Sequence, residues 1–361
     1  GGAGGLELAR RLGARYGRKN HDIILVDRNR SHIWKPLLHE VAAGSLDANM
    51  DEVGYGGHGA RWGYRFFNGT LEGIDREKRE IITAPMIDAD GNEIIGRHHI
   101  RYDYLVLALG GVSNTFGVDG VAEHCLFLET RDQADAFRAK LLNLCLRVSH
   151  ISETTSKRPS VRICIVGGGA TGVELAAELF NAAESLKNYG LEVFDASRLT
   201  VTLLEAGPRI LPALPEKLAN AARDELVERG VEVMTGAQVS KVEEGIVHTK
   251  DGKTIEADLT VWAAGVKGHQ LLRTLDGLEV DRADRLEVRP TLQTTLDDRI
   301  FAIGDCCSFI PEGADRPVPP RAQAAHQMAT SVYTNLKALM AGRNSRELKP
   351  FVYHDHGSLV T

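Results

Sequence analysis

The residues best suited to do chemistry lie in one glycine-rich stretch. An apolar strand from Val161 to Val166 runs into Gly167, Gly169 and Gly172, and a helix rich in alanine, glutamate and leucine follows. With this spacing the first glycine makes a tight turn, the second lets a pyrophosphate approach the backbone, and the third lets the helix pack closely on the strand. The helix N-terminus offers N–H groups to phosphates. The stretch therefore predicts a dinucleotide-binding turn.

Such a turn needs an acidic residue at the end of the next strand to hold the adenosine ribose. Glu205 follows the strand Leu199 to Leu204 and lies 33 residues after Gly172 (205 − 172). The usual gap is about 20 residues, so we expect an insertion around Leu186 to Ser197. A carboxylate repels a 2′-phosphate and favours NADH over NADPH, although the nearby Arg209 leaves this preference open.

The beginning of the chain has the pattern of a second such turn. Gly2 and Gly5 have the spacing of the second and third glycines, and a helix and a strand follow. The strand ends at Asp27, which lies 22 residues after Gly5 (27 − 5). The first glycine and the first strand would precede Gly1. We therefore expect a fragment that lacks this strand.

A repeated plan connects the two turns. The segment Asp103 to Gly111 (DYLVLALGG) corresponds to Asp258 to Val266 (DLTVWAAGV), and Gly110 and Gly265 occupy matching offsets. Each segment follows a region with strand-like alternation. The duplication predicts an α/β fold with two Rossmann-like dinucleotide-binding domains and β excursions, which would bring two dinucleotides face to face.

Two later segments place polar side chains at the ends of expected elements. The strand Thr295 to Asp305 ends in an aspartate that is placed to bind a ligand hydroxyl, and a simple turn aspartate is the alternative. Prolines before Arg321 predict a helix start there. Gln323 and Gln327 share a face of this helix and would bind a quinone carbonyl or a flavin edge, unless they are only a polar helix face.

Other segments are expected to form helices and a connecting loop. Lys35 and Pro36 begin a short amphipathic helix within His32 to Gly44, where this sequence has no CxxxxC pair, so a disulfide substrate is disfavoured. Arg131 to Val148 has the spacing of a packing helix, and Ser152 to Ser160 is expected to be a loop.

Composition excludes several classes of protein. A net charge of −6 over 361 residues is too acidic for a nucleic-acid-binding domain. The five cysteines lack the spacing of a metal site or a disulfide framework and are interpreted as reduced cytosolic thiols. We therefore expect no metal.

The motifs together resemble the bacterial type II NADH dehydrogenases, single-subunit flavoproteins that pass electrons from NADH to membrane quinone without pumping protons. The resemblance covers the whole chain, and its most specific part is the AQxxxQ element, because wider relatives share the glycine motifs and generally lack it. The segments that carry it are HIWKPLLHEVAAGSLD (32–47), IVGGGATGVELAAEL (165–179), LLEAGPRILPALP (203–215), ADLTVWAAG (257–265), PTLQTT (290–295), IGDC (303–306), PPRAQAAHQMAT (319–330) and HGSLV (356–360).

The resemblance implies a role for each matching residue. FAD would be held by Gly2, Gly5, Asp27, Lys35, Pro36, Gly110 and Asp305, and NADH by Gly167, Gly169, Gly172, Glu205 and Gly265. Glu174 resembles the family's glutamate near nicotinamide and flavin, which is linked to proton handling, although it is equally interpreted as an acid that complements the helix dipole. Gln323 and Gln327 resemble the quinone-side pair.

The resemblance also implies the organisation of the chain. Residues 1–115 and 285–361 would form a discontinuous FAD-binding domain, and residues 116–284 an NADH-binding domain. A membrane-binding C-terminal region would follow Thr361 and place the enzyme on the cytoplasmic face of the inner membrane, with a homodimer left open. Three alternatives remain: a soluble NADH-dependent flavoprotein reductase, a sulfide:quinone reductase, for which the adjacent Cys306 and Cys307 are poorly placed, and a nucleotide-binding redox sensor without turnover.

Overall fold

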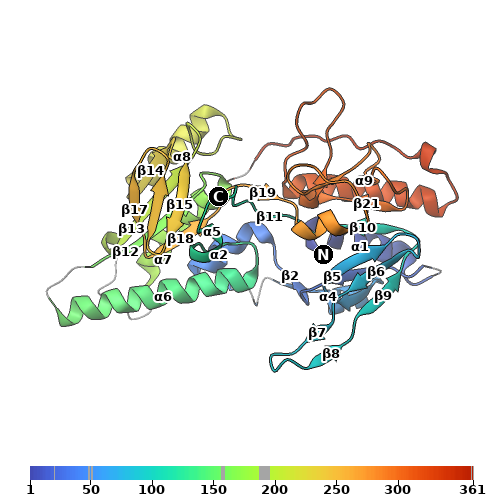
Figure 1. Ribbon diagram of the computed structural model, residues 1–361, viewed down its shortest axis with the longest axis horizontal. Coiled ribbons are helices and arrows are strands. Elements are labelled where there is room, and N and C mark those ends of the chain that lie inside the picture. The colour runs from blue at the N-terminus through green and yellow to red at the C-terminus, as the bar shows by residue number, and fades with distance from the viewer. Residues whose placement is uncertain are drawn as a thin grey trace. The chain divides into compact units, whose positions relative to one another are not determined.

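The computed structural model describes residues 1–19, 21–47, 49, 52–155, 159–186, 196–358 and 360. The chain forms two compact units (Figure 1). Unit 1 comprises residues 1–32, 52–112 and 266–356, and unit 2 comprises residues 33–51, 113–265 and 357–361. Residues 33–51 thus belong to unit 2, and residues 266–284 belong to unit 1. Most of the expected insertion, residues 187–195, lies outside the described residues.

Unit 2 is built on a parallel sheet in the order β14-β13-β12-β18. Its strands are β12 (Val161–Val166), β13 (Leu199–Glu205), β14 (Val231–Thr235) and β18 (Leu259–Trp262). The two predicted strands on either side of the glycine turn are confirmed, since β12 has the predicted bounds and β13 adds only Glu205. Both carry long apolar runs because a parallel sheet is covered on both faces.

Helices and a small antiparallel sheet complete unit 2. The helices are η1 (Lys35–Leu37), α2 (Leu38–Ala43), α5 (Val121–His124), α6 (Arg131–Thr154), α7 (Ala170–Leu186), η3 (Ala196–Arg198) and α8 (Glu216–Glu228). The antiparallel strands are β15 (Val239–Glu243), β16 (Ile246–Thr249) and β17 (Thr254–Glu256). One apolar core includes residues of α2, α6, α7 and the parallel sheet.

The packing helix α6 is longer than the sequence predicted. It begins at Arg131 as expected, because Thr130 and Gln133 form a reciprocal capping box. It continues to Thr154, so the prediction of a loop from Ser152 onward was wrong for its first residues. The hydroxyls of Ser152 and Thr154 donate to the carbonyls of Val148 and His150, which lets these polar residues remain in a helix.

Unit 1 contains parallel pairs that correspond to the second glycine unit. The strand β1 (Ile24–Asp27) pairs with β4 (Arg65–Asn68), and β10 (Leu105–Leu107) pairs with β21 (Ile300–Ala302). The predicted strand over Thr295 to Asp305 was too long, because its first half turns around Asp297 and only residues 300–302 extend. The main helices are α1 (Gly2–Tyr16), α4 (Tyr55–Trp62) and α9 (Ala322–Met340). The start of α9 confirms the prediction from the prolines.

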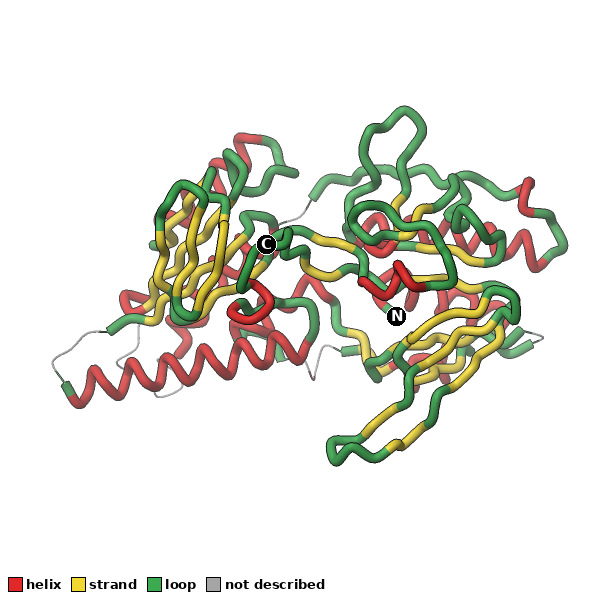
Figure 2. The backbone as a smooth tube through the Cα atoms, in the orientation of Figure 1, coloured by secondary structure: helices red, strands yellow, loops and turns green. Residues whose placement is uncertain are grey.

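The β excursion of unit 1 is antiparallel. It consists of β5 (Leu71–Asp75), β6 (Glu80–Thr83) and β9 (His98–Arg101), from which the hairpin β7 (Met86–Ile87) and β8 (Glu93–Ile95) projects (Figures 1 and 2). The remaining short elements are β2 (Ser31–His32), β3 (Val53–Gly54), β19 (Val266–Lys267), η4 (Gln270–Thr274), β20 (Leu286–Glu287), η5 (Gly304–Cys306), β22 (Cys307–Ser308) and η6 (Ser345–Glu347), and β11 (Val112–Ser113) falls at the boundary of the units.

None of the helices among the described residues combines the length and the apolar character needed to cross a bilayer.

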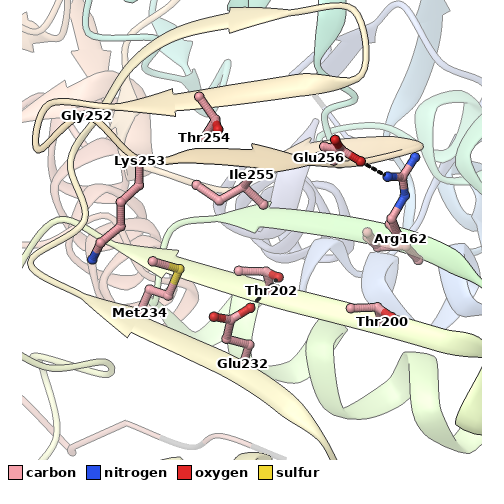
Figure 3. A pocket seen from close by; sticks show the side chains of 11 residues that line it. Arg162, Thr200, Thr202, Glu232, Met234, Gly252, Lys253, Thr254, Ile255 and Glu256 are labelled. Atoms are coloured by element: carbon pink, nitrogen blue, oxygen red, sulfur yellow. Dashed lines mark hydrogen bonds and ion pairs between the residues drawn. The ribbon is translucent and has the colours of Figure 1, made fainter.

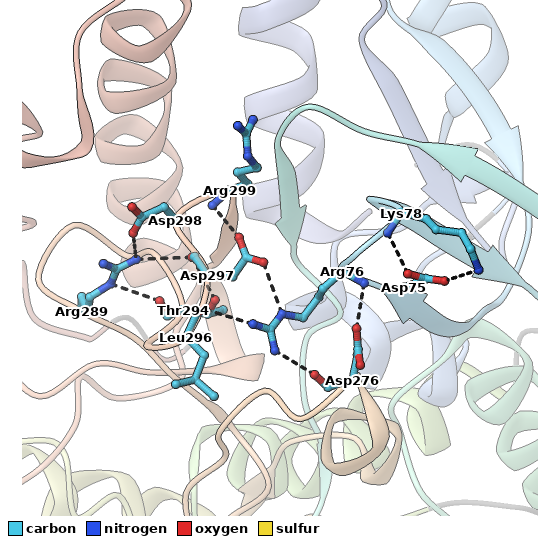
Figure 4. A network of polar contacts seen from close by, with 10 residues as sticks. All are labelled: Asp75, Arg76, Lys78, Asp276, Arg289, Thr294, Leu296, Asp297, Asp298 and Arg299. Carbon is cyan, nitrogen blue, oxygen red and sulfur yellow. Dashed lines mark hydrogen bonds and ion pairs between the residues drawn. The ribbon is translucent and has the colours of Figure 1, made fainter.

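Arg76 ties the β excursion to a distant part of unit 1 (Figure 4). Its guanidinium donates to the carbonyls of Asp276 and Leu296 at 2.9 and 3.0 Å and to the carboxylate of Asp297 at 3.3 Å. Its backbone N–H donates to the Asp276 carboxylate at 2.7 Å. The side chains of Arg76 and Asp297 are 26% and 17% exposed, so solvent only partly replaces these bonds. One residue thus joins segments about 200 positions apart.

We expect Arg76→Ala to lower the free energy of unfolding by about 2 kcal/mol, because Asp297 and two carbonyls lose their donor. For a unit of this size that is about 4 to 8 °C in Tm. Thermal unfolding measures this. Arg101→Ala is the control, since Arg101 also pairs with a carboxylate but is 87% exposed, and it should cost less than about 0.5 kcal/mol. Equal losses in both variants would contradict the assignment.

Candidate functional site

The glycine turn of unit 2 is tight at two positions and open at a third. Gly167 has φ +118°, a conformation that L side chains rarely adopt. A Cβ on Gly172 would lie 2.0 Å from the carbonyl oxygen of Gly167, whereas a Cβ on Gly169 would meet nothing within 4 Å. The turn therefore requires glycine at two positions for packing, and at Gly169 it leaves the backbone accessible.

Glu205 lies against this turn at the end of β13. Its carboxylate accepts the N–H of Gly168 at 2.7 Å and the N–H of Gly207 at 2.6 Å. The sequence expectation of an acid beside the turn is therefore met in space. Arg209, the residue that left the coenzyme preference open, donates to the carbonyls of Leu214 and Pro212 at 2.8 and 3.0 Å. These bonds hold its guanidinium in its own loop.

Unit 1 gathers several of the predicted residues around the N-terminus of α1. A Cβ on Gly5 would lie 3.0 Å from the Cβ of Ala108, and one on Gly2, which has φ +73°, would lie 3.7 Å from the Ala108 carbonyl. Gly110 has φ +71° and open space where its Cβ would be. Asp305 lies beside the segment that contains Gly110, since a Cβ on Gly111 would be 3.2 Å from the Asp305 Cβ.

Asp27 is the last residue of β1 and lies beside Gly1 at the start of α1. A Cβ on Gly1 would lie 1.8 Å from its carboxylate oxygen, and the hydroxyl of Tyr55 donates to that carboxylate at 3.3 Å. Burial and the nearby Asp27 charge raise the pKa of Tyr55, so this hydroxyl stays protonated and remains a donor. Tyr55 is a contact that the sequence did not reveal.

The remaining predicted residues are in unit 2 or on α9. Lys35 and Pro36 lie in η1, and Gly265, with φ +66°, is packed against Phe116 and Asn114. Glu174 lies near the start of α7, and the imidazole Nδ1 of the buried His39 is 3.6 Å from its Oε2. His39 belongs to α2, and the sequence analysis did not single it out.

Gln323 and Gln327 lie on one face of α9, and both contact the C-terminal segment of unit 1. Gln327 donates to the His354 carbonyl at 2.8 Å and accepts its N–H at 2.9 Å. Gln323 accepts the N–H of His356 at 3.1 Å and donates to the carboxylate of Asp355 at 3.4 Å. Both amides thus form hydrogen bonds with the backbone of residues 354–356.

The cysteines are not arranged for thiol chemistry. All five are buried and unpaired. Burial raises the pKa of Cys306 to about 11 and that of Cys307 well above its usual value. Because the thiolate is the reactive form, this pair is poorly suited to attack a disulfide or a sulfide-derived sulfur. Among the described residues, no group of three or more His, Cys, Asp or Glu side chains could hold a metal ion.

A cavity of about 530 Å³ in unit 2 is not the dinucleotide site. It lies between the parallel sheet and β17, with Arg162, Thr200 and Glu232 among its lining residues (Figure 3). Arg162 and Thr200 are near the amino ends of β12 and β13, whereas ligands of such sheets bind outside the carboxyl ends. Its carboxylates are engaged, since Glu256 pairs with Arg162 and Glu232 accepts a hydrogen bond from Thr202 at 3.3 Å.

Comparison with known proteins agrees with this geometry. A family model described as pyridine nucleotide-disulphide oxidoreductase matches residues 1–329, and this defines the class of the fold and site. A type II NADH:quinone oxidoreductase of Haemophilus influenzae is 47% identical over 373 aligned positions, which span 100% of this chain and 83% of that protein. The chain belongs to the type II NADH:quinone oxidoreductases, as the sequence resemblance predicted.

More distant relatives support the same fold. A type II NADH:quinone oxidoreductase of Staphylococcus aureus is 31% identical, over 100% of this chain and 85% of that one. A structure of NDH2 from Plasmodium falciparum in complex with NADH superposes with a TM-score of 0.81 at 18% identity and covers 99% of this chain and 85% of that one. The predicted two-dinucleotide-binding flavoprotein fold is therefore confirmed.

The glycine turn yields a paired prediction. Gly169→Ala should fold with an unchanged Tm, because the added methyl meets no protein atom, but should weaken NADH binding at least tenfold, or about 1.4 kcal/mol. Gly172→Ala should instead lower Tm by several degrees, because its methyl collides with the Gly167 carbonyl. Thermal unfolding and NADH titration of both variants check this. Tight NADH binding by Gly169→Ala would show that no phosphate approaches that backbone.

Proposed function

We propose that this protein transfers a hydride from NADH to FAD and two electrons onward to a quinone, without pumping protons. The observation that carries the proposal is the duplicated glycine turn, with an acid at the end of the following strand, Glu205 in unit 2 and Asp27 in unit 1. A protein with two such turns is equipped for two dinucleotides, and the family to which the chain belongs oxidises NADH with a quinone.

Unit 1 is assigned to FAD and unit 2 to NADH. The residues of unit 1 fit a flavin dinucleotide. Gly2 and Gly110 have positive φ, and Gly110 has open space beside it. Asp27 lies beside Gly1, and Asp305 lies beside Gly111. The bound FAD would supply the hydride acceptor and the source of electrons for the quinone. Asp27 would hold the adenosine ribose and Asp305 the ribitol chain. The family resemblance assigns Lys35 and Pro36, which lie in η1, to the same cofactor.

The start of α9 supplies an electrostatic role in unit 1. Gly304 packs near the first turn of α9, since a Cβ on it would lie 3.4 Å from the Ala325 Cβ. The positive end of the helix dipole favours negative charge nearby, and a reduced flavin carries such charge at its N1 and C2 carbonyl edge. Gln323 and Gln327, in the first two turns of the same helix, would donate to a quinone carbonyl.

In unit 2 the fingerprint helix would bind the NADH pyrophosphate. The N-terminal N–H groups of α7 and the open backbone at Gly169 would meet the phosphates, and Glu205 would move from the Gly168 and Gly207 amides to the ribose hydroxyls. Gly265 would flank the nicotinamide end. Glu174 would handle a proton near the reacting atoms.

The membrane and the quinone are proposed as partners because the chain belongs to this family. The quinone would be a membrane quinone, and the protein would be peripheral to the cytoplasmic face of the bacterial inner membrane. A homodimer is compatible with this arrangement. A soluble NADH-dependent flavoprotein reductase remains the second candidate, because residues 354–356 already lie along the glutamine pair.

The quinone site is tested by anaerobic stopped-flow spectroscopy of the holoenzyme. NADH should bleach the flavin band in wild type and in Gln323→Ala alike, and a soluble quinone should restore the band at least tenfold more slowly in the variant, because one carbonyl donor is lost. If NADH bleaches the flavin and quinone does not restore it in wild type, the protein is a soluble reductase of another acceptor.

A control separates quinone binding from the C-terminal segment. Gln323→Ala also loosens residues 354–356, so Asp355→Ala, which removes the Asp355 contacts with Arg321 and Gln323, serves as the matched variant. Reoxidation slowed in Gln323→Ala but not in Asp355→Ala supports a quinone role for the amide. Equal slowing in both variants assigns the effect to the segment.

Coenzyme preference tests the role of Glu205. Glu205→Gln removes the charge that repels a 2′-phosphate and keeps an amide oxygen as acceptor, so kcat/KM for NADPH relative to NADH should rise about tenfold. Steady-state kinetics with both coenzymes measure this. Glu228→Gln, an exposed glutamate at the end of α8, is the control and should leave the ratio unchanged. An unchanged ratio in both variants would remove Glu205 from the ribose site.

A further inference from the structure

The imidazole of His39 lies between two carboxylates within unit 2. Its Nδ1 is 3.6 Å from Glu174 Oε2, and its Nε2 is 3.9 Å from Glu40 Oε1. The His39 side chain is 5% exposed and that of Glu174 is 11% exposed, whereas Glu40 is 30% exposed. A buried imidazole is costly unless its N–H has a polar partner, and the carboxylate nearest to a ring nitrogen here is that of Glu174.

Packing fixes the imidazole in this place. The helix α2 packs against α6 and α7, and its Leu38, Val41 and Ala42 are in the same apolar core as Phe137 of α6 and Val173 of α7. Gly44, with φ +92°, ends α2, and its backbone N–H donates to the carbonyls of Glu40 and Val41. The residue on α7 next to Val173 is Glu174, so the apolar contact of the two helices brings the imidazole to the carboxylate.

We propose that His39 is a positioning residue for Glu174. The N–H at Nδ1, 3.6 Å from Glu174 Oε2, holds that carboxylate in one orientation, and the core packing of α2 keeps the ring in place. The inference rests on the proposed function for the role of Glu174, and it adds a residue from a segment 135 positions earlier in the chain (174 − 39).

The role has a place in the balanced reaction. NADH, one proton and a quinone give NAD⁺ and a quinol, so the hydride supplies two electrons and one hydrogen nucleus, and one proton comes from solvent. Glu174 is assigned to proton handling, and the direction in which its carboxylate points depends on what it contacts. His39 acts only through that carboxylate and is assigned no contact with either dinucleotide.

A double-mutant cycle tests the contact without substrate. His39→Leu and Glu174→Gln should each change the Tm of the holoenzyme, and the shift in the double variant should differ from the sum by several degrees, because paired groups are not additive. His39→Leu combined with Glu178→Gln is the matched control: Glu178 is one turn further along α7 and accepts from Asn181, so those shifts should add. Additivity in both cycles overturns the contact.

Kinetics test the positioning role itself. With NADH and a soluble quinone, His39→Leu should lower kcat about tenfold and leave KM for NADH within twofold, and it should have no further effect in the Glu174→Gln background. His39→Asn keeps an amide donor at the place of Nδ1 and should recover most of kcat. A raised KM, no recovery by asparagine, or an additive loss in the Glu174→Gln background would assign His39 a structural role only.

The two proposals fail in different ways. If quinone does not restore the flavin band of the wild-type enzyme, the proposed function fails, while the Tm cycle still tests the His39–Glu174 contact. If quinone turnover is normal and the Tm cycles are both additive, the proposed function stands and this inference fails.

Discussion

The structure of unit 2 depends on a close approach between backbone segments at the glycine turn. The position of a Cβ on Gly172 is 2.0 Å from the Gly167 carbonyl oxygen, so helix α7 leaves strand β12 with no room for a side chain. Because of this close approach, the first turn of α7 lies just beyond the end of β12. The turn also binds the loop after β13. The N–H of Gly168 donates to the Glu205 carboxylate, and the carbonyl of Gly168 accepts the N–H of Leu211 at 2.7 Å. Glu205 and the loop that contains Leu211 are thus held against the turn.

The same plan recurs in unit 1 under the same steric rule. A Cβ on Gly5 would lie 3.0 Å from the Cβ of Ala108, so the start of α1 comes close to the segment that follows β10. The returning segments of the two units both end in a left-handed glycine, Gly110 at φ +71° and Gly265 at φ +66°. An internal repeat visible in the sequence therefore corresponds to a repeated backbone geometry, and this supports two nucleotide sites on one chain.

Local patterns were readable from the sequence, and long-range packing was not. The bounds of β12 and the start of α9 follow from apolar runs and prolines, whose effects are confined to a few residues. That residues 33–51 join unit 2 depends on the fit of Leu38 and Val41 into the core of α6 and α7, which no spacing encodes. His39 was missed for that reason: nothing near it in sequence shows that Glu174 lies beside it. The length of β21 was overestimated because the chain turns around Asp297, whose carboxylate accepts a hydrogen bond from Arg76, more than 200 residues away.

The polar groups of the two units can orient a bound cofactor and stabilise its charge, but none of the groups described above is an activated nucleophile. Burial raises the pKa of Cys306 and Cys307, so the two adjacent thiols are kept protonated, and Tyr55 is held as a neutral donor to Asp27. What the two units present instead are helix N-termini, carboxylates at strand ends and a pair of amides. Such groups can fix the position and charge of a cofactor, and the cofactor then supplies the reactive atoms. A scaffold of this kind changes its acceptor by changing a few polar contacts, because the oxidation of NADH does not depend on any reactive side chain.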